Sequence, residues 1–343
     1  MLADDDPSRD WTEPGVYRCA PDVYRIPLPL PSDGLRAVNV YAVADGDGWT
    51  LIDGGWAIAA AREQLVAAFA ALGSTLSDIR RFLVTHVHRD HYTQAVALRR
   101  EFGATVALGR GEQPSLERLN NPNQDADSPR IELLLRGGAK PLVERIRAEW
   151  AFRPNPADWE FPDEWIDDGD EIVVGDRRKL TAIATPGHTQ GHVVFADPAA
   201  DLLFAGDHVL PRITPSIGLE SVASRRPLAD FLASLRLLKT RPDALLLPAH
   251  GPVEMRVHER VDQLLAHHAD RLERTLSAVR EGRSTAYEVA GALTWTRRNR
   301  RLDELDLFNA AMAVTETMAH LDVLADRGAV TVTEQEGVLH YRV

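Results

Sequence analysis

The sequence predicts a layered α/β region followed by a mainly helical C-terminal segment. Short apolar, β-branched runs alternate with Ala- and Leu-rich helical stretches up to about residue 250. After Gly251 and Pro252 the strand pattern stops until a short tail. The 343 residues, 44% hydrophobic and 26% charged, are typical of a folded protein with one large or two ordinary domains. We therefore predict a division into residues 1–254 and 255–343.

Turn residues separate the predicted elements of the first half. The pattern predicts strands at 38–43 and 49–53, a helix at 59–72 ended by Gly73, a strand at 82–84, a helix at 92–102 and a strand at 105–108. Residues 109–165 are predicted to form a partly helical insertion over the core. Its aromatic residues are more typical of anchors than of substrate contacts; they are Trp150, Phe152, Trp159, Phe161 and Trp165.

The second half begins with short strands and ends with helices. Strands are predicted at 172–174, 180–184, 193–196, 202–205 and 244–247, with a helix at 228–238. Beyond residue 255 we predict helices at 257–281, 286–293 and 310–325 and a hairpin of 330–332 with 339–343.

The charge balance disfavours several classes of partner. There are 39 basic and 51 acidic residues, so the net charge is 39 − 51 = −12. This argues against a protein built mainly to grip nucleic acid, without excluding it, and against binding to an anionic membrane. Only three of the basic residues are lysine, which we interpret as bacterial coding bias.

Cysteine content and the apolar runs indicate a cytoplasmic protein. The single cysteine, Cys19, excludes an intrachain disulfide, which suits a reducing compartment. Residues 1–11 have neither the basic nor the apolar region of a signal peptide. No apolar run approaches the roughly 18–20 residues of a membrane-spanning helix.

The run HVHRDH carries the strongest chemical signal. It contains His86, His88, Asp90 and His91, between a predicted strand and a predicted helix, so we place it on a tight loop. Three imidazoles and a carboxylate are costly to bury without a partner, and a divalent metal ion satisfies them. The alternative is a solvated, histidine-rich loop.

Three further positions follow apolar strands and adjoin glycines. They are His188 in PGHT, Asp207 in AGD and His250 in AHG. Strand ends of a layered α/β domain converge on one edge, where sites form. Together with the HVHRDH run, they give five histidines and two aspartates. Seven ligands are too many for one tetrahedral ion and suit two ions that share a bridge.

In this order the motifs HxHxDH, PGHT, GD and AHG resemble the metallo-β-lactamase superfamily, and Leu51 to Gly55 (LIDGG) matches its first motif. The resemblance covers about residues 20–253 and implies an αββα sandwich. It implies that one metal is held by His86, His88 and His188, a second by Asp90, His91 and His250, and that Asp207 bridges both. Asp53 would orient ligands from behind, or alternatively cap the turn after its strand.

Departures from the family pattern narrow the function. Asp207 occupies a position where zinc β-lactamases usually have cysteine or serine, so the chain is more similar to glyoxalase II-like thioesterases, lactonases and RNA- or phosphodiester-cleaving members. A metal-bridging hydroxide would attack the substrate, and Asp90 would orient it and accept its proton. We expect Zn²⁺ in both sites, with Fe or Mn as alternatives.

The loop after Asp207, residues 208–219, is predicted to form a pocket wall. His208 is a possible substrate contact. Arg212 could bind an anionic group of a substrate, although a surface ion pair is the alternative.

The C-terminal segment is similar to a winged-helix module that some RNA-cleaving relatives carry. Its last helix is acidic, with Glu316, Asp322 and Asp326, which phosphate would repel. The basic cluster at 297–301 is typical of a solvated loop. We expect the segment to brace the first domain, cover the pocket or form a homodimer.

The leading hypothesis is therefore a dinuclear hydrolase of a small-molecule ester, thioester or lactone. The alternatives are a nuclease of the same fold and a non-catalytic metal-binding regulatory protein.

Overall fold

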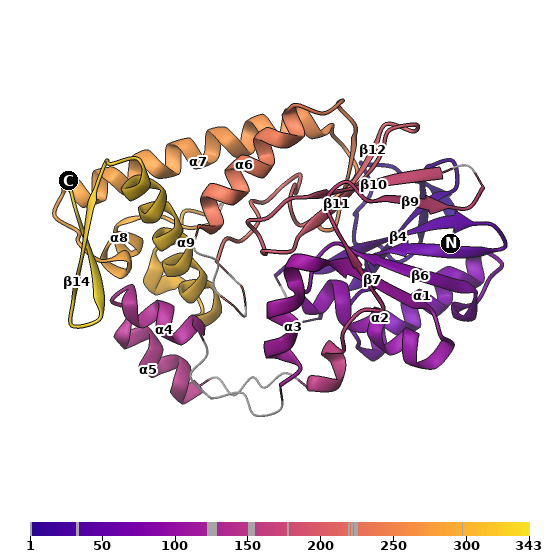
Figure 1. Cartoon of the computed structure of the whole chain (residues 1–343), viewed down its shortest axis with the longest axis horizontal. Helices are drawn as coiled ribbons and strands as arrows, with labels where there is room; N and C mark the ends of the chain where they lie inside the picture. The colour runs from indigo at the N-terminus through magenta and orange to yellow at the C-terminus, as the bar shows by residue number, and fades with distance from the viewer. Residues whose placement is uncertain are drawn as a thin grey trace.

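Two β-sheets lie face to face, on the right of Figure 1, and helices pack against the outer face of each sheet. This computed structural model describes residues 2–31, 34–121, 129–149, 155–176, 178–218, 220, 222, 226–296 and 298–343. The first sheet has the order β1 to β8: Leu2–Asp4, Val16–Ala20, Val23–Pro29, Ala37–Asp45, Gly48–Ile52, Ile79–Val84, Thr105–Gly109 and Glu164–Ile166. The second has the order β13-β12-β11-β10-β9, which are Leu245–Pro248, Leu202–Gly206, Val193–Asp197, Arg178–Ala184 and Glu171–Val174.

Three apolar cores separate the layers. The core between the sheets contains Tyr41 and Leu83 from the first and Phe195 and Phe204 from the second. A second core joins the outer face of the first sheet to α1 (Ala59–Ala71), α2 (Arg89–Phe102) and α3 (Gln113–Leu119). The third lies on the other side, between the second sheet and α6 (Pro227–Lys239) and α7 (Val257–Arg280). The result is the predicted αββα sandwich.

The C-terminal helices extend the third core (Figure 1, left). They are α8 (Ala286–Ala292) and α9 (Leu307–Asp326), followed by the hairpin of β14 (Thr331–Gln335) and β15 (Val338–Arg342). Val194 of the second sheet and Leu321 of α9 belong to one apolar cluster. The third core contains residues from both sides of residue 255. Packing therefore does not separate two domains at this point, and the predicted division stays a prediction. Among the described residues, no helix is long and apolar enough to cross a membrane.

The insertion at 109–165 is divided between two places. Trp159 is buried in the core that faces α2, and Trp165 packs against the same core, as anchors do. Phe161 is 41% exposed, and Trp150 and Phe152 lie outside the described residues. The helices α4 (Pro129–Arg136) and α5 (Lys140–Glu149) pack against α9.

Most predicted elements are confirmed, with two corrections. The strands β1, β2 and β3 were not predicted, although they build one side of the first sheet. The prediction that HVHRDH lies wholly on a loop is wrong: α2 begins at Arg89, so Asp90 and His91 lie in its first turn. The apolar pattern predicts a helix only from Tyr92, but the helix dipole favours a carboxylate in the first turn, so the helix begins three residues earlier.

The core between the sheets should dominate the stability of the sandwich. Phe195→Ala removes a wholly buried ring and should lower the free energy of unfolding by about 3–5 kcal/mol. Phe161→Ala, at a position that is 41% exposed, is the matched control and should cost less than about 1 kcal/mol. Denaturant unfolding of the metal-free protein measures both, and equal losses would contradict this assignment of the core.

Candidate metal centre

Four strand ends meet at one edge of the sandwich. In the first sheet, β6 ends at Val84 and is followed by the run from Thr85 to His91. In the second sheet β10, β12 and β13 run in the same direction, because β10 and β12 are each antiparallel to β11 and β12 is parallel to β13. Their ends are followed by the loops that carry His188, Asp207 and His250. The structure thus brings together all seven predicted ligands.

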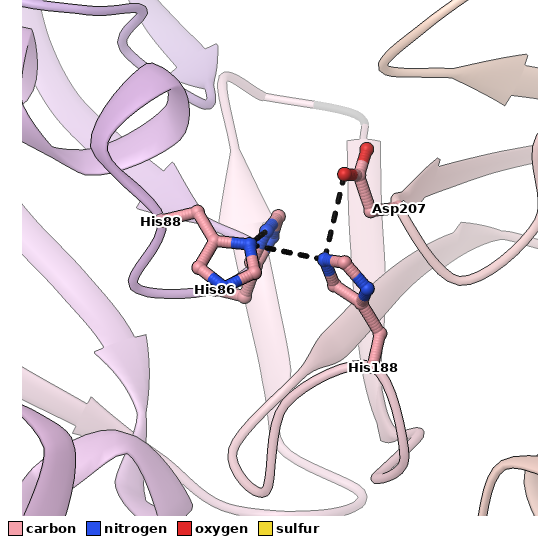
Figure 2. Close-up of side chains that lie close together, drawn as sticks. All are labelled: His86, His88, His188 and Asp207. Atoms are coloured by element: carbon pink, nitrogen blue, oxygen red, sulfur yellow. Dashed lines mark hydrogen bonds and ion pairs between the residues drawn. The ribbon is translucent and has the colours of Figure 1, made fainter. Parts of the chain in front are cut away.

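The first cluster consists of His86, His88, His188 and Asp207, whose ligand atoms all lie within 4.8 Å of one another. Figure 2 shows that these side chains point toward one centre: His86 and His88 come from one loop, and His188 and Asp207 from two others. Nδ1 of His88 lies 3.0 Å from Nε2 of His86 and 3.0 Å from Nε2 of His188. Three imidazole nitrogens and a carboxylate at this spacing are a suitable ligand set for one zinc ion.

The second cluster consists of Asp90, His91 and His250. Nε2 of His250 is 3.5 Å from Oδ2 of Asp90, and Nε2 of His91 is 3.7 Å from the same oxygen. Asp207 lies between the clusters: its Oδ1 is 3.3 Å from His250 Nε2, and its Oδ2 is 3.5 Å from His188 Nε2. Its two oxygens therefore face different clusters, as a bridging carboxylate requires.

The nitrogen and oxygen atoms that face the centre are suited to bind metal ions. Nε2 of His91, Nε2 of His250 and Oδ1 of Asp207 are buried and have no hydrogen-bond partner among the described residues. Buried polar atoms normally have partners, and a divalent ion would satisfy all three. Burial, followed by the neighbouring His91, holds the pKa of His86 well below its usual value, so its ring is neutral and able to bind a metal.

Hydrogen bonds from behind orient the rings. His188 donates from Nδ1 to the carbonyl of Ser216 at 2.7 Å, and His250 donates from Nδ1 to the carbonyl of Ala37 at 2.8 Å. Each bond leaves the Nε2 lone pair facing the centre. Asn39 donates to the carbonyl oxygens of Pro248 and Gly251, which fixes the loop that carries His250.

Asp53 has the supporting position that the resemblance implied. It is 2% exposed, and its Oδ2 lies 2.9 Å from Nδ1 of His91. Its Oδ1 accepts from the backbone N–H of Thr85 at 2.8 Å. The residue also has the left-handed φ of 62°, which turns the chain at the end of β5. The side chain of Asp53 thus contacts His91 and Thr85, in agreement with ligand support, whereas the alternative of a cap on the turn after its strand stays a prediction.

The predicted substrate contacts have less suitable positions. His208 is wholly buried, next to the ring of Phe231, and its predicted contact with substrate stays a prediction. Arg212 forms the alternative ion pair, with two contacts of 3.0 and 2.7 Å to Glu254. Leu219, the end of the predicted pocket wall, lies outside the described residues.

Two supporting side chains were not identified as such from sequence. His192 accepts from the backbone N–H of Asp207 at 3.2 Å through Nε2 and contacts the Thr185 hydroxyl at 2.9 Å through Nδ1. Glu112 is wholly buried and contacts the loops of the first cluster. A lone glutamate after a strand has no sequence signal of its own.

Comparison with known proteins assigns this architecture to a family. The model of the Metallo-beta-lactamase superfamily matches residues 33–250, a span that contains all seven predicted ligands. The chain belongs to this superfamily and is a metal-dependent hydrolase. The superfamily binds divalent metals, usually two, in agreement with the two clusters.

Individual relatives extend the similarity over nearly the whole chain. A metallo-beta-lactamase family protein from Thermus thermophilus is 30% identical, with a TM-score of 0.76 over 95% of this chain and 99% of that one. The probable metallo-hydrolase YqjP of Bacillus subtilis is 26% identical over 90% of this chain and 94% of its own length. A hydroxyacylglutathione hydrolase of Acidiphilium cryptum is 29% identical over 63% and 69%. The resemblance of the C-terminal segment to a winged helix stays a prediction.

Metal loading should release protons. Burial lowers the pKa of His91, but the carboxylates of Asp53, Asp90 and Asp207 outweigh it and raise the pKa to about 10. The metal-free ring is then protonated at neutral pH and must lose a proton to bind a metal. We expect the apparent zinc affinity to rise from pH 6 to pH 8. Calorimetry in two buffers of different ionisation enthalpy measures the released protons, and equal heats in both buffers would contradict this.

Asp53→Asn should weaken the second site selectively. Asparagine tolerates the left-handed φ and keeps an oxygen acceptor for Thr85, but it removes the charge beside His91. The affinity for the second metal should fall about 10–100-fold. Asp201→Asn is the matched control, because Asp201 is exposed and also has a left-handed φ of 52°. Unchanged binding of both ions by Asp53→Asn would rule out the support role.

Proposed function

We propose that the protein hydrolyses a small-molecule ester, thioester or lactone with two Zn²⁺ ions. The observation that carries the proposal is the position of Asp207, with one oxygen toward each of two clusters of metal-binding side chains. Imidazole and carboxylate donors without a thiolate suit zinc and also accommodate iron or manganese. Cys19 supplies no ligand, since its Sγ lies beside Asp5, 3.3 Å from Oδ2.

The metal ions, when bound, would polarise the substrate carbonyl and lower the pKa of water to near neutrality. The side chains of the chain would orient the reactants and move the proton. Asp90 is the best placed carboxylate for the proton, because its side chain is 14% exposed, against 9% for Asp207 and 3% for Asp53. His91 and His250 hold its Oδ2 at 3.7 and 3.5 Å, so its orientation is fixed before substrate arrives.

Two observations support a small acyl substrate. The hydroxyacylglutathione hydrolase among the relatives is named for an acyl-thioester substrate. The acidic chain, with a net charge of −12, also provides little attraction for a polyanion.

The helix that would read nucleic acid in a winged-helix protein is not accessible. Helix α9 packs against α4, α5, α6, α7 and α8, and Ala313, Met318 and Val323, which point to three different sides of the helix, are all buried. In the preceding loop, Arg300 donates to the carbonyl of Glu304 and Arg301 pairs with Asp303, while Arg297 lies outside the described residues. These contacts favour a helix that braces the sandwich over one that enters a groove.

Metal removal should abolish activity reversibly. The chain is expected to bind two zinc ions after careful loading, and a chelator should remove activity that added zinc restores. A panel of thioesters, lactones, simple esters, β-lactams, phosphodiesters and RNA identifies the substrate class. Turnover of thioesters or lactones alone supports the proposal. RNA cleavage with salt-sensitive binding would establish the nuclease alternative, and less than one metal per chain would favour the non-catalytic one.

Asp90→Asn tests the proton acceptor. The amide is similar in size but cannot take up a proton, so kcat/KM should fall by about 10²–10⁴-fold on the preferred substrate. Metal content must be measured in parallel, because Asp90 is also a candidate ligand. Asp270→Asn, at an exposed residue of α7 paired with Arg274, is the control and should retain activity. Full activity of Asp90→Asn on every substrate would overturn the assignment.

A further inference from the structure

Glu112 is a buried carboxyl group that the reaction does not use. It ends the short 3₁₀ segment Arg110–Glu112, directly after β7, and is wholly inaccessible to solvent. Its Oε2 has no partner among the described residues, so the energetic cost of burying it falls on the contacts of Oε1. Burying this carboxyl group destabilises the folded chain, so the two contacts of Oε1 must explain why a glutamate occupies the position.

Both contacts of Oε1 lead to the first metal cluster. The backbone N–H of Val87, which lies between His86 and His88, donates to Oε1 at 3.3 Å. The hydroxyl of Thr189, the residue after His188, donates a short hydrogen bond to the same oxygen. One carboxylate oxygen therefore links the loop of the first sheet to the loop of the second sheet, and these loops carry all three histidines of the first cluster.

Three glycines allow this link. A Cβ on Gly109 would meet the carbonyl oxygen of Gly191 at 2.1 Å, and a Cβ on Gly191 would meet the backbone nitrogen of Glu112 at the same distance. A Cβ on Gly111 would lie 2.7 Å from the carbonyl oxygen of Gln190. Real side chains never pack so closely, so the two segments are in direct backbone contact, which places the Glu112 carboxyl group beneath the PGHT loop.

The two clusters thus have different supports. Asp53 contacts His91 of the second cluster through Oδ2. It reaches the first cluster only through Thr85, whose hydroxyl lies 3.0 Å from Nδ1 of His86. Among the residues that the structure describes, the hydrogen bonds of the Glu112 carboxylate go to segments of the first cluster only. The two segments are also joined by their backbones, because the N–H of Val193 donates to the carbonyl of Thr85 at 2.8 Å.

We propose that Glu112 is the positioning residue of the first metal site, fixing the distance between the loop of His86 and His88 and the loop of His188. This inference rests on the two-metal centre of the proposed function, but not on any substrate. Burial raises the pKa of Glu112 to about 7, against the hydrogen bonds from Thr189 and Val87. Near neutral pH the carboxyl group is therefore partly protonated. Its charged form and its neutral form both keep an oxygen that accepts a hydrogen bond, and so does the amide of a glutamine.

Binding of Co²⁺ to the metal-free full-length protein tests the proposal without substrate. The Nδ1 protons of His188 and His250 are held by carbonyl oxygens, so their metal-shifted NMR signals report the first and second ions separately. Glu112→Ala should weaken the first ion about 10–100-fold and leave the second within about threefold. Glu112→Gln keeps the acceptor and should recover most of the lost affinity.

Two controls separate positioning from damage to the fold. Glu117→Ala makes the same change at an exposed position of α3 and should alter neither ion. Asp53→Asn should show the opposite selectivity. If Glu112→Ala does not fold, Thr189→Val removes the hydroxyl contact alone and should weaken the first ion selectively.

An unchanged first ion in Glu112→Ala, equal weakening of both ions, or a Glu112→Gln variant as weak as Glu112→Ala would overturn the proposal. Failure of the proposed function is a separate result: two ions bind with the stated selectivity, but no ester, thioester or lactone is turned over.

Discussion

The structure depends on one arrangement, a buried group of imidazoles and carboxylates whose lone pairs face one another. The Nε2 atoms of His91 and His250 and the Oδ1 atom of Asp207 have no protein partner among the described residues. Without cations, this concentration of buried polar atoms that lack hydrogen-bond partners would be strongly unfavourable. Metal binding and folding of this edge are therefore coupled, and the supporting hydrogen bonds behind each ring reduce the entropy lost when a metal is bound.

The distance between the two sheets sets the geometry of the centre. His86 and His88 follow a strand of the first sheet, whereas His188 and Asp207 follow strands of the second. The apolar core between the sheets fixes the spacing of these strands, and close backbone contacts at the edge fix the spacing of the loops. Substitutions far from the metals can therefore alter the first site, because its ligands come from both sheets.

The helical segment is part of the same body as the second sheet. Its helix α9 shares an apolar core with α6 and the second sheet, and Gly218 of the loop after β12 lies close to Thr315 of α9. The loop also contains Ser216, whose carbonyl orients His188. The segment is thus connected to the metal centre through one loop. A bracing role follows from these contacts more directly than a separate binding role.

The sequence by itself predicted most of the elements and the candidate ligands. Alternating apolar runs and glycines predicted the sandwich, and the spacing within HxHxDH, PGHT, GD and AHG predicted seven side chains that the structure brings together. The fold and the proximity of these side chains were predictable because each prediction depends on a local pattern. Asp53 was identified through its motif, since it directly precedes the glycine turn.

Only the tertiary structure decided the features that join distant segments. It placed Asp90 and His91 in a helix, paired Arg212 with Glu254 and added the strands β1 to β3. It also placed Glu112 against Val87 and Thr189, which are 25 and 77 residues away in the chain. No local pattern encodes such contacts, because they exist only once the cores have set the distance between the sheets.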